Sequence, residues 1–334
     1  MNNQLRNPFQ HQPLPWLATL HRHAFRSGKR EVWEPVKFAS RVGFYIGHSI
    51  WPWPVMGTAE VDVGESTRSF RFDARNRMFS AVYFDQFSAG YEPPVMALID
   101  ALMPDDGVFF DIGSNWGYYS VYLAARPGFR GRIHAFEPWP QTFHDLTSTV
   151  AQLNFAESIT CHNIALGAAE QTGNMRCGSH SGNAHICHGN GGVKLPIRPL
   201  DELDVPTPHI LKVDTEGHEE AVFRGARRTL TKSRPMIVFE HRYELDLAEQ
   251  RMRGSLEYLE SLDYRLFLPR FNGRSHHVDP RDGNGADAKS FLDDGVRLRD
   301  CNSKTRGESR EIPDLFACPV DKFEELRGRN WIDA

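Results

Sequence analysis

The pattern of apolar and polar positions changes at about residue 95, where short apolar runs begin to alternate with stretches of helical spacing. Seven apolar runs have the length of buried strands, at 107–112, 132–137, 158–165, 209–214, 235–240, 264–269 and 314–320. Three stretches typical of helices lie between the first five, at 116–126, 141–155 and 217–232. Strands that alternate with helices predict a doubly wound α/β domain, in which helices cover both faces of a mostly parallel sheet.

Two segments depart from this alternation. Residues 1–60 are rich in Pro, Trp and His and have little periodicity. We expect residues 1–90 to form an appendage that packs over the main domain, with a short helix at 16–25. Residues 91–334 form the main domain in this interpretation. Within it, residues 270–312 are polar and rich in Gly, Asp and Arg, which predicts a long and partly disordered surface insertion.

Composition narrows the class of protein. The formal net charge of −4 gives no indication of a nucleic-acid partner, and no apolar run is long enough to predict a membrane span. The N-terminal segment lacks the basic head and apolar core of a secretory signal. The five cysteines are odd in number and irregularly spaced, which favours a reducing cytoplasmic location over a disulfide framework.

The segment "FFDIGSNWGYYSVYLAA" (109–125) joins the first strand to the first helix through a glycine turn. Ligands of open α/β sheets bind at the carboxyl ends of strands, where Asp111 lies. Gly113 and Gly117 permit a tight turn, and the N–H groups that open the helix can face a carboxylate or phosphate. The spacing G-x-N-x-G differs from the dinucleotide pattern G-x-G-x-x-G, and an acid at the strand end suits a cationic group.

The next strand ends at Glu137, whose carboxylate can accept two hydrogen bonds from a ribose diol. Pro138 and Trp139 follow and offer surfaces for an adenine ring. S-adenosylmethionine carries an ammonium, a carboxylate and a ribose, whereas NAD lacks the amino-acid end. The predicted cofactor-binding residues are Asp111, Gly113, Ser114, Asn115, Gly117, Glu137, Pro138 and Trp139.

Five segments follow one another within residues 90–245: "FFDIGSNWGYYSVYLA", "IHAFEPWPQTF", "LPIRPLDEL", "ILKVDTEGHEEAVFRGARRTL" and "RPMIVFEH". The same order is seen in FkbM-type S-adenosylmethionine-dependent methyltransferases, which these residues resemble. The resemblance implies a Rossmann-like, seven-stranded class I methyltransferase fold with an antiparallel last strand. It also implies methyl transfer to a hydroxyl, commonly of a sugar, glycolipid or secondary metabolite. Residues 1–90 and 270–312 follow no pattern of this family, and both bear on the choice of acceptor.

Methyl transfer to a hydroxyl requires that the acceptor oxygen be aligned and its proton removed by a base or with the help of a metal. "KVDTEGHEE" supplies Asp214 at a strand end and Glu216 in the following turn, and "FEH" supplies Glu240 at the next strand end. Clustered carboxylates suit either a general base or a divalent cation, so a cation stays possible. We expect Asp214 and Glu216, then Glu240, to act on the acceptor, with His218 and His241 as alternative bases.

Other polar residues of this region have simpler interpretations. Glu219 is expected on a solvated helix face, and Lys212 is expected to pair with a nearby acid. Residues 177–192 contain ligand types for zinc but no pair of matched spacings, at Cys177, His180, His185, Cys187 and His188. A glycine-rich loop over the active site is favoured there, with Asn183 and His185 as substrate contacts.

Three other functions remain open at this point. A nicotinamide-dependent oxidoreductase has a similar architecture, but the turn spacing and paired acids argue against it. A non-catalytic binding protein on the same fold would have no need of the glycines together with Asp111 and Glu137. A nucleic-acid methyltransferase would show a basic face or an N-P-P-Y-like strand end, whereas "DTEG" stands here. The predicted acceptor is therefore a small molecule or carbohydrate.

Overall fold

The computed structural model describes residues 7–10, 55–83, 87, 90–177, 184–187, 191–240, 248–271, 296–303, 314–328 and 331. Several expectations lie outside these residues: the short helix at 16–25, the substrate contact Asn183, the alternative base His241, and His180 and His188 of the zinc-ligand types.

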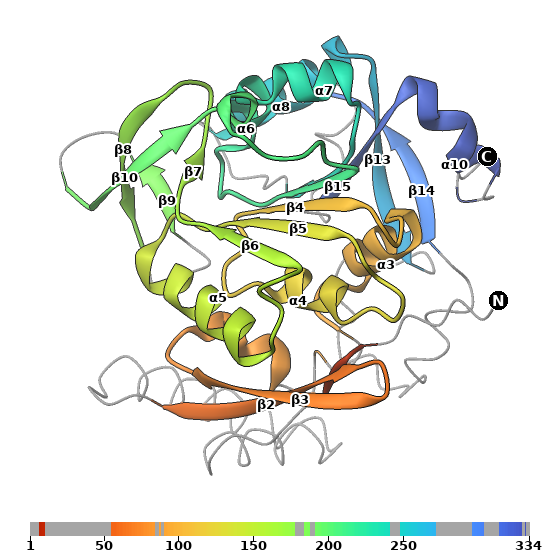
Figure 1. Cartoon of the computed structure of the whole chain (residues 1–334). Coiled ribbons are helices and arrows are strands. Elements are labelled where there is room, and N and C mark those ends of the chain that lie inside the picture. The colour runs from red at the N-terminus through yellow and green to blue at the C-terminus, as the bar shows by residue number, and fades with distance from the viewer. Residues whose placement is uncertain are drawn as a thin grey trace, which may run out of the picture.

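An eight-stranded sheet forms the centre of the protein, in the order β14-β13-β15-β12-β11-β4-β5-β6 (Figure 1). Its strands are β4 (Val108–Ile112), β5 (Arg132–Phe136), β6 (Ile159–His162), β11 (Ile210–Val213), β12 (Met236–Glu240), β13 (Tyr264–Phe271), β14 (Val296–Cys301) and β15 (Asp314–Pro319). Neighbours among β4, β5, β6, β11 and β12 are parallel, and β15 is antiparallel to both β12 and β13. Each predicted strand is present, and β15 is the antiparallel last strand of the predicted seven.

The eighth strand, β14, corrects the expectation of seven strands and of a purely surface insertion at 270–312. It pairs antiparallel with β13 along the sheet edge. Leu298 is fully buried between the exposed side chains of Arg297 and Arg299, and Cys301 is buried at the end of the strand. The polar average composition of the insertion concealed these two buried positions.

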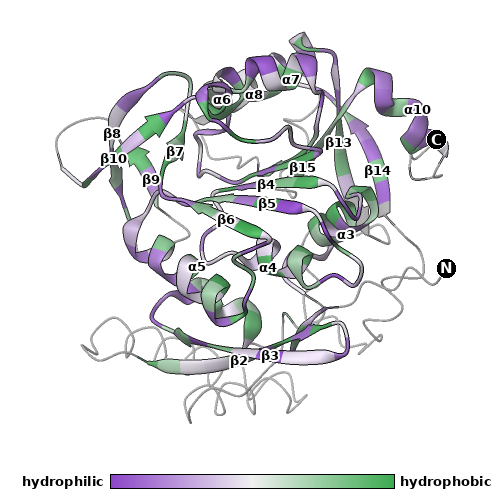
Figure 2. Cartoon of the chain, viewed as in Figure 1, coloured by the Kyte–Doolittle hydropathy of each residue, from purple (hydrophilic) through white to green (hydrophobic). Residues whose placement is uncertain are grey.

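Helices cover both faces of the sheet, which confirms the doubly wound α/β prediction (Figure 1). On one face lie α3 (Pro93–Leu102), α4 (Tyr118–Ala124) and α5 (Pro140–Gln152), and on the other α6 (Glu219–Gly225), α7 (Arg227–Lys232) and α8 (Ala248–Ser261). Phe109 and Phe110 are both fully buried but belong to different apolar cores, one on each face. Figure 2 shows hydrophobic residues concentrated on α3 and the central strands, whereas α10 (Phe323–Gly328) is largely hydrophilic.

The described part of the appendage forms a three-stranded antiparallel sheet and packs over α4, as expected. Its elements are β1 (Phe9–Gln10), β2 (Met56–Val63), β3 (Ser66–Asp73) and the 3-10 helix η1 (Arg77–Val82). Aromatic side chains join it to the main domain, because Phe79 and Phe70 both stack on Trp116, with ring centroids 4.8 and 5.9 Å away. The appendage therefore shares a core with the main domain.

A second, four-stranded sheet lies beside the first, in the order β7-β10-β8-β9. It comprises β7 (Ala165–Leu166), β8 (Gln171–Arg176), β9 (His185–Cys187) and β10 (Val193–Arg198), and the 3-10 helix η4 (Leu200–Glu202) follows. The predicted loop at 177–192 thus contains a strand. Among the residues given above, none of the helices has the length and apolar character needed to cross a membrane.

Candidate active site

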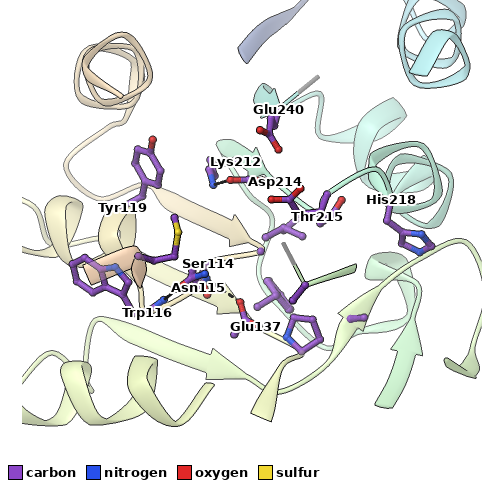
Figure 3. A pocket seen from close by; sticks show the side chains of 18 of the residues that line it. Ser114, Asn115, Trp116, Tyr119, Glu137, Lys212, Asp214, Thr215, His218 and Glu240 are labelled. Atoms are coloured by element: carbon purple, nitrogen blue, oxygen red, sulfur yellow. Dashed lines mark hydrogen bonds and ion pairs between the residues drawn. The ribbon is translucent and has the colours of Figure 1, made fainter. Parts of the chain in front are cut away.

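An open cavity lies at the carboxyl ends of β4, β5, β11 and β12, where the sequence placed the ligand site (Figure 3). Five of the eight predicted cofactor-binding residues line it: Gly113, Ser114, Asn115, Glu137 and Pro138. The acids Asp214, Glu216 and Glu240 line it as well. Asp111, Gly117 and Trp139 are not among its lining residues.

The glycine turn brings two strand ends into close contact. Gly113 has φ +77°, and a β-carbon there would lie 1.7 Å from the carbonyl oxygen of Asp214. Gly117 has φ +91°, and a β-carbon there would lie 2.6 Å from Leu146 Cδ1. Side chains are disfavoured at both positions for two reasons. A β-carbon would collide with neighbouring atoms of the protein, and the backbone has a positive φ.

The five backbone N–H groups from Gly113 to Gly117 all donate hydrogen bonds within the protein. Gly113 and Ser114 donate to the carbonyl oxygen of Phe136, over 2.9 and 3.1 Å. The remaining bonds are 2.9 Å each and run from Asn115 to Glu137 Oε2, from Trp116 to Asn115 Oδ1, and from Gly117 to Ser114 O. In this arrangement the turn offers no N–H group to the carboxylate that the sequence analysis assigned to it.

Asp111 forms a hydrogen bond with the first turn of α4. Its carboxylate is fully buried, and the Ser120 hydroxyl in the first turn of α4 donates to Oδ2 over 2.7 Å. Burial raises the pKa of Asp111, although Lys212 and the bond from Ser120 lower it. The carboxylate therefore lies behind the cavity wall, beside the start of the helix.

Glu137 presents a fixed carboxylate to the cavity. Trp139 N donates to Oε1 over 2.8 Å and Asn115 N donates to Oε2 over 2.9 Å, so the positions of both oxygens are set. Burial raises the pKa of Glu137 to about 7, although these backbone bonds lower it. A carboxylate has about four acceptor sites, so both oxygens can still accept from a ligand diol.

The four-stranded sheet supplies an apolar wall next to Glu137. Its lining residues include Ala165, Met175, Ala184 and Ile186. His185 lies between two of these in β9, so its side chain points to the other face, and it is exposed. His185 is therefore not among the lining residues, whereas its two neighbours are.

Trp139 belongs to the interior of the same small sheet. It packs against the apolar cluster formed by Ala165, Met175, Ala184, Leu195 and Ile197. Pro138 takes the position at the cavity that the sequence assigned to both residues. The sequence could not separate them, because their order along the chain does not show which one the small sheet covers.

Three acids meet at the other end of the cavity. Asp214, Glu216 and Glu240 each offer one carboxylate oxygen, and these oxygens lie within 4.8 Å of one another. Within the described ranges, no other group of three His, Cys, Asp or Glu side chains is so close. The described part of residues 177–192, which has the ligand types for zinc, therefore contains no such group. Lys212 Nζ lies 2.9 Å from Asp214 Oδ2, which confirms that Lys212 pairs with an acid.

Lys212 is a buried cation in an acidic surrounding. Its burial lowers the pKa, but Asp214, Asp111 and Glu92 outweigh that effect and hold the pKa above its ordinary value. The side chain is therefore charged and offsets part of the repulsion among the nearby carboxylates.

Glu219 is a buried hydrogen-bond acceptor, which corrects the expectation of a solvated helix face. Its Oε1 accepts from Thr215 N, Thr215 Oγ1 and Gly217 N, over 3.0, 2.9 and 3.1 Å. These bonds hold the turn that carries Glu216, whose φ of +57° is rare outside glycine. A threonine four residues before a glutamate at a helix start was the available signal.

His218 lines the cavity but lies apart from the acids. Figure 3 shows its ring on the far side of Thr215 from Asp214 and Glu240. A β-carbon at Gly167 would lie 3.1 Å from His218 Nε2, so the ring adjoins the strand junction next to the small sheet. The structure does not bring His218 together with the carboxylates that it was expected to replace as a base.

The sequence analysis missed a group of residues from the start of α3. Glu92 and Tyr91 line the cavity, and the Tyr119 hydroxyl donates a hydrogen bond to the Glu92 carboxylate. Lys212 Nζ lies 4.8 Å from the centroid of the Tyr119 ring. Met78 of η1, which belongs to the appendage, also lines the cavity. No motif marks Glu92, because its neighbours in space are distant along the chain.

Comparisons with known proteins find similarity to methyltransferases. The Methyltransferase FkbM domain matches residues 111–266. The hexuronic acid methyltransferase AglP of Haloferax volcanii is 29% identical over 161 residues, which cover 45% of this chain and 62% of AglP. The match therefore spans less than two thirds of the length of that relative.

Two solved structures are among those similar to this chain. Methyltransferase FkbM from Methylobacillus flagellatus KT has 16% identity and a TM-score of 0.39, over 67% of this chain and 50% of that one. The O-methyltransferase from Bacillus cereus in complex with SAH has 13% identity and a TM-score of 0.36, over 74% of this chain and 97% of that one.

Proposed function

Residues 111–266 belong to the FkbM methyltransferase family, and from this premise we propose that the protein transfers the methyl group of S-adenosylmethionine to an oxygen atom of a carbohydrate acceptor. One observation carries the proposal. The cavity has a fixed carboxylate, Glu137, at one end and the group of Asp214, Glu216 and Glu240 at the other. These are the groups that nucleoside binding and removal of a hydroxyl proton require.

The residues at the Glu137 end fit the nucleoside part of the cofactor. Both oxygens of Glu137 are held in the cavity wall, in reach of a ribose diol. Pro138, Met175 and Ile186 supply apolar surface for an adenine ring. Gly113 lets the turn beside Glu137 pack directly against the backbone of Asp214, since it carries no side chain there. When bound, S-adenosylmethionine supplies an activated methyl group.

At the other end, the acids handle the acceptor proton. A sugar hydroxyl has a pKa far above 7, so its attack is assisted when a carboxylate accepts the proton as the new bond forms. Asp214, Glu216 and Glu240 are grouped for that role. Glu219 acts as a positioning residue, because it fixes the turn between Thr215 and Gly217.

The same three acids have the chemistry of ligands for a divalent cation. Lys212 already places an ammonium 2.9 Å from Asp214 Oδ2, so an incoming cation would have to compete with a buried positive charge. We therefore favour proton transfer to a carboxylate without a metal. Excess chelator is expected to leave turnover unchanged, and loss of activity that Mg²⁺ restores would contradict this.

The proposed acceptor is a sugar, in line with the printed name of AglP, which refers to a hexuronic acid. The family match disfavours the nicotinamide-dependent alternative. Small-molecule acceptors such as secondary metabolites remain within the same chemistry, because the acids act on a hydroxyl irrespective of the molecule that carries it.

Calorimetric titration with S-adenosylhomocysteine, with NADH as the control, tests the cofactor. Binding of S-adenosylhomocysteine alone is expected, and Glu137→Gln should weaken it by about tenfold through loss of charge-assisted bonds. Mass spectrometry of reactions with hexuronic acids and neutral sugars then identifies the acceptor. Binding of NADH in preference to S-adenosylhomocysteine would refute the proposal.

A further inference from the structure

The amino-acid end of S-adenosylmethionine carries an ammonium and a carboxylate, and both need partners in the cavity. The two features assigned to them from sequence do not present suitable groups. The N–H groups of the turn from Gly113 to Gly117 are all bonded within the protein, and Asp111 is fully buried and does not line the cavity. The charged side chains that do line the cavity are therefore better placed to hold this end.

A matched pair of charges lies a short distance away, beside α4. Lys212 is the only lysine or arginine among the lining residues that the structure describes. Glu92 lines the same cavity and interacts electrostatically with Lys212. Tyr119 contacts both, since its hydroxyl donates to the Glu92 carboxylate and Lys212 Nζ lies 4.8 Å from its ring centroid.

We propose that Lys212 binds the carboxylate and Glu92 the ammonium of the cofactor's amino-acid end. This inference rests on the proposed function and extends it to residues outside the glycine turn. An ammonium has three donors, so Lys212 can bind a ligand carboxylate while it stays bonded to Asp214. A carboxylate has about four acceptor sites, so Glu92 can accept from Tyr119 and from a ligand ammonium together.

The position of this pair suits a single extended ligand. Figure 3 shows Lys212 and Glu137 on opposite sides of the turn that carries Ser114 and Asn115. A nucleoside at Glu137 therefore places its amino-acid end across the turn, toward Lys212 and Tyr119. Glu92 has φ +48°, a conformation that is disfavoured outside glycine and that recurs at functional sites.

The test compares S-adenosylhomocysteine with 5′-methylthioadenosine, which has the same nucleoside and sulfur but no amino-acid end. The wild-type protein should bind S-adenosylhomocysteine at least about tenfold more tightly in calorimetric titrations. Glu92→Gln should weaken S-adenosylhomocysteine about tenfold and leave methylthioadenosine within about twofold. Asp145→Asn is the matched control, because Asp145 accepts a 2.8 Å bond from Asn76 and does not line the cavity.

The role of Lys212 is tested by changing the ligand as well as by substituting the lysine. Substitution alone is insufficient, because loss of the ammonium leaves the neighbouring acids without their cation and can prevent folding. The decarboxylated analogue of S-adenosylhomocysteine keeps the ammonium and lacks the carboxylate. Wild-type protein should bind it about tenfold more weakly than S-adenosylhomocysteine, and Lys212→Met should bring the two affinities together. If Lys212→Met does not fold, equal affinity of the wild-type protein for the two ligands would still overturn the assignment, because a carboxylate bound by an ammonium must contribute to affinity.

The outcomes separate this inference from the function on which it rests. Equal affinity of the wild-type protein for S-adenosylhomocysteine and methylthioadenosine would overturn the inference and leave the proposed function standing. So would a Glu92→Gln variant that loses affinity equally for both ligands, or for neither. Failure of the wild-type protein to bind either ligand would overturn the proposed function and the inference with it.

Discussion

A β-carbon on Gly113 would lie 1.7 Å from the carbonyl oxygen of Asp214. The turn assigned to the cofactor and the turn that begins the acidic group are therefore in backbone contact. A shift of one turn must displace the other, so cofactor binding and the placement of the reactive acids depend on the same packing.

Gly113→Ala should therefore be strongly destabilising. The added carbon overlaps backbone that cannot rotate away, and φ is +77°, so we expect a loss of about 3 kcal/mol in the free energy of unfolding. Urea denaturation measures it. The control is Gly64→Ala, where φ is +62° but no atom lies within 4 Å, and the expected cost is about 1 kcal/mol. Equal losses in the two variants would contradict the contact.

Glu137 should make stability depend on pH. Its pKa in the folded protein is about 7 against an ordinary value of 4.5, because burial disfavours the charged form. The resulting stability is present below pH 4.5 and is lost as pH rises through about 7, by about 3 kcal/mol. Glu137→Gln removes this group, so its unfolding free energy should fall less than that of the wild type between pH 5 and 8.

The same ionisation should affect ligand binding in the opposite direction. A ribose diol donates its hydrogen bonds best to the ionised carboxylate. The affinity for S-adenosylhomocysteine should therefore rise up to about tenfold between pH 6 and 8 in the wild type and stay flatter in Glu137→Gln. Calorimetry at three pH values measures this, and parallel profiles for the two proteins would exclude Glu137 as the ribose ligand.

Asp214→Asn should separate chemistry from binding. We expect kcat to fall by about 10²- to 10⁴-fold, as for loss of a group that assists proton transfer, while the Kd of S-adenosylhomocysteine changes by less than about threefold. Single-turnover kinetics and calorimetry provide the two values. The exposed acid Glu202 serves as the control through Glu202→Gln. Full activity in Asp214→Asn would remove Asp214 from the reactive group.

Phe79 should be necessary for the attachment of the appendage. It is 1% exposed and stacks on both Trp116 and Phe72, with centroids 4.8 and 4.7 Å away. Phe79→Ala should cost about 3–5 kcal/mol of unfolding free energy. Met56→Ala, in β2 of the same appendage with Met56 41% exposed, should stay within about 0.5 kcal/mol. Similar values in chemical denaturation would show that the aromatic contact contributes little.

The amino-acid sequence determined the central sheet, the glycine turn and the position of Glu137 at a strand end. Each depends on local information: apolar runs of strand length, glycines where φ is positive, and Glu137 directly after its strand. Because parallel strands end at one edge of a sheet, the grouping of Asp214, Glu216 and Glu240 also followed from their places along the chain. The pairing of Lys212 with a nearby acid was also predicted, and it is present.

Only the tertiary structure decided which of these side chains reach the cavity. Asp111 is at the expected strand end, but α4 covers it and Ser120 takes its carboxylate. A glutamate at the start of a helix is expected to be solvated. Glu219 is instead buried, and its carboxylate accepts hydrogen bonds from the turn before the helix.

The group of Glu92, Tyr119 and Lys212 shows the physical reason. These residues come from the start of α3, from α4 and from β11, and no spacing along the chain links them. Their proximity depends on how the helices pack on the sheet, which burial of apolar surface decides over the whole domain. Local patterns predicted the elements and their strand-end chemistry, whereas packing decided which charges face the same space.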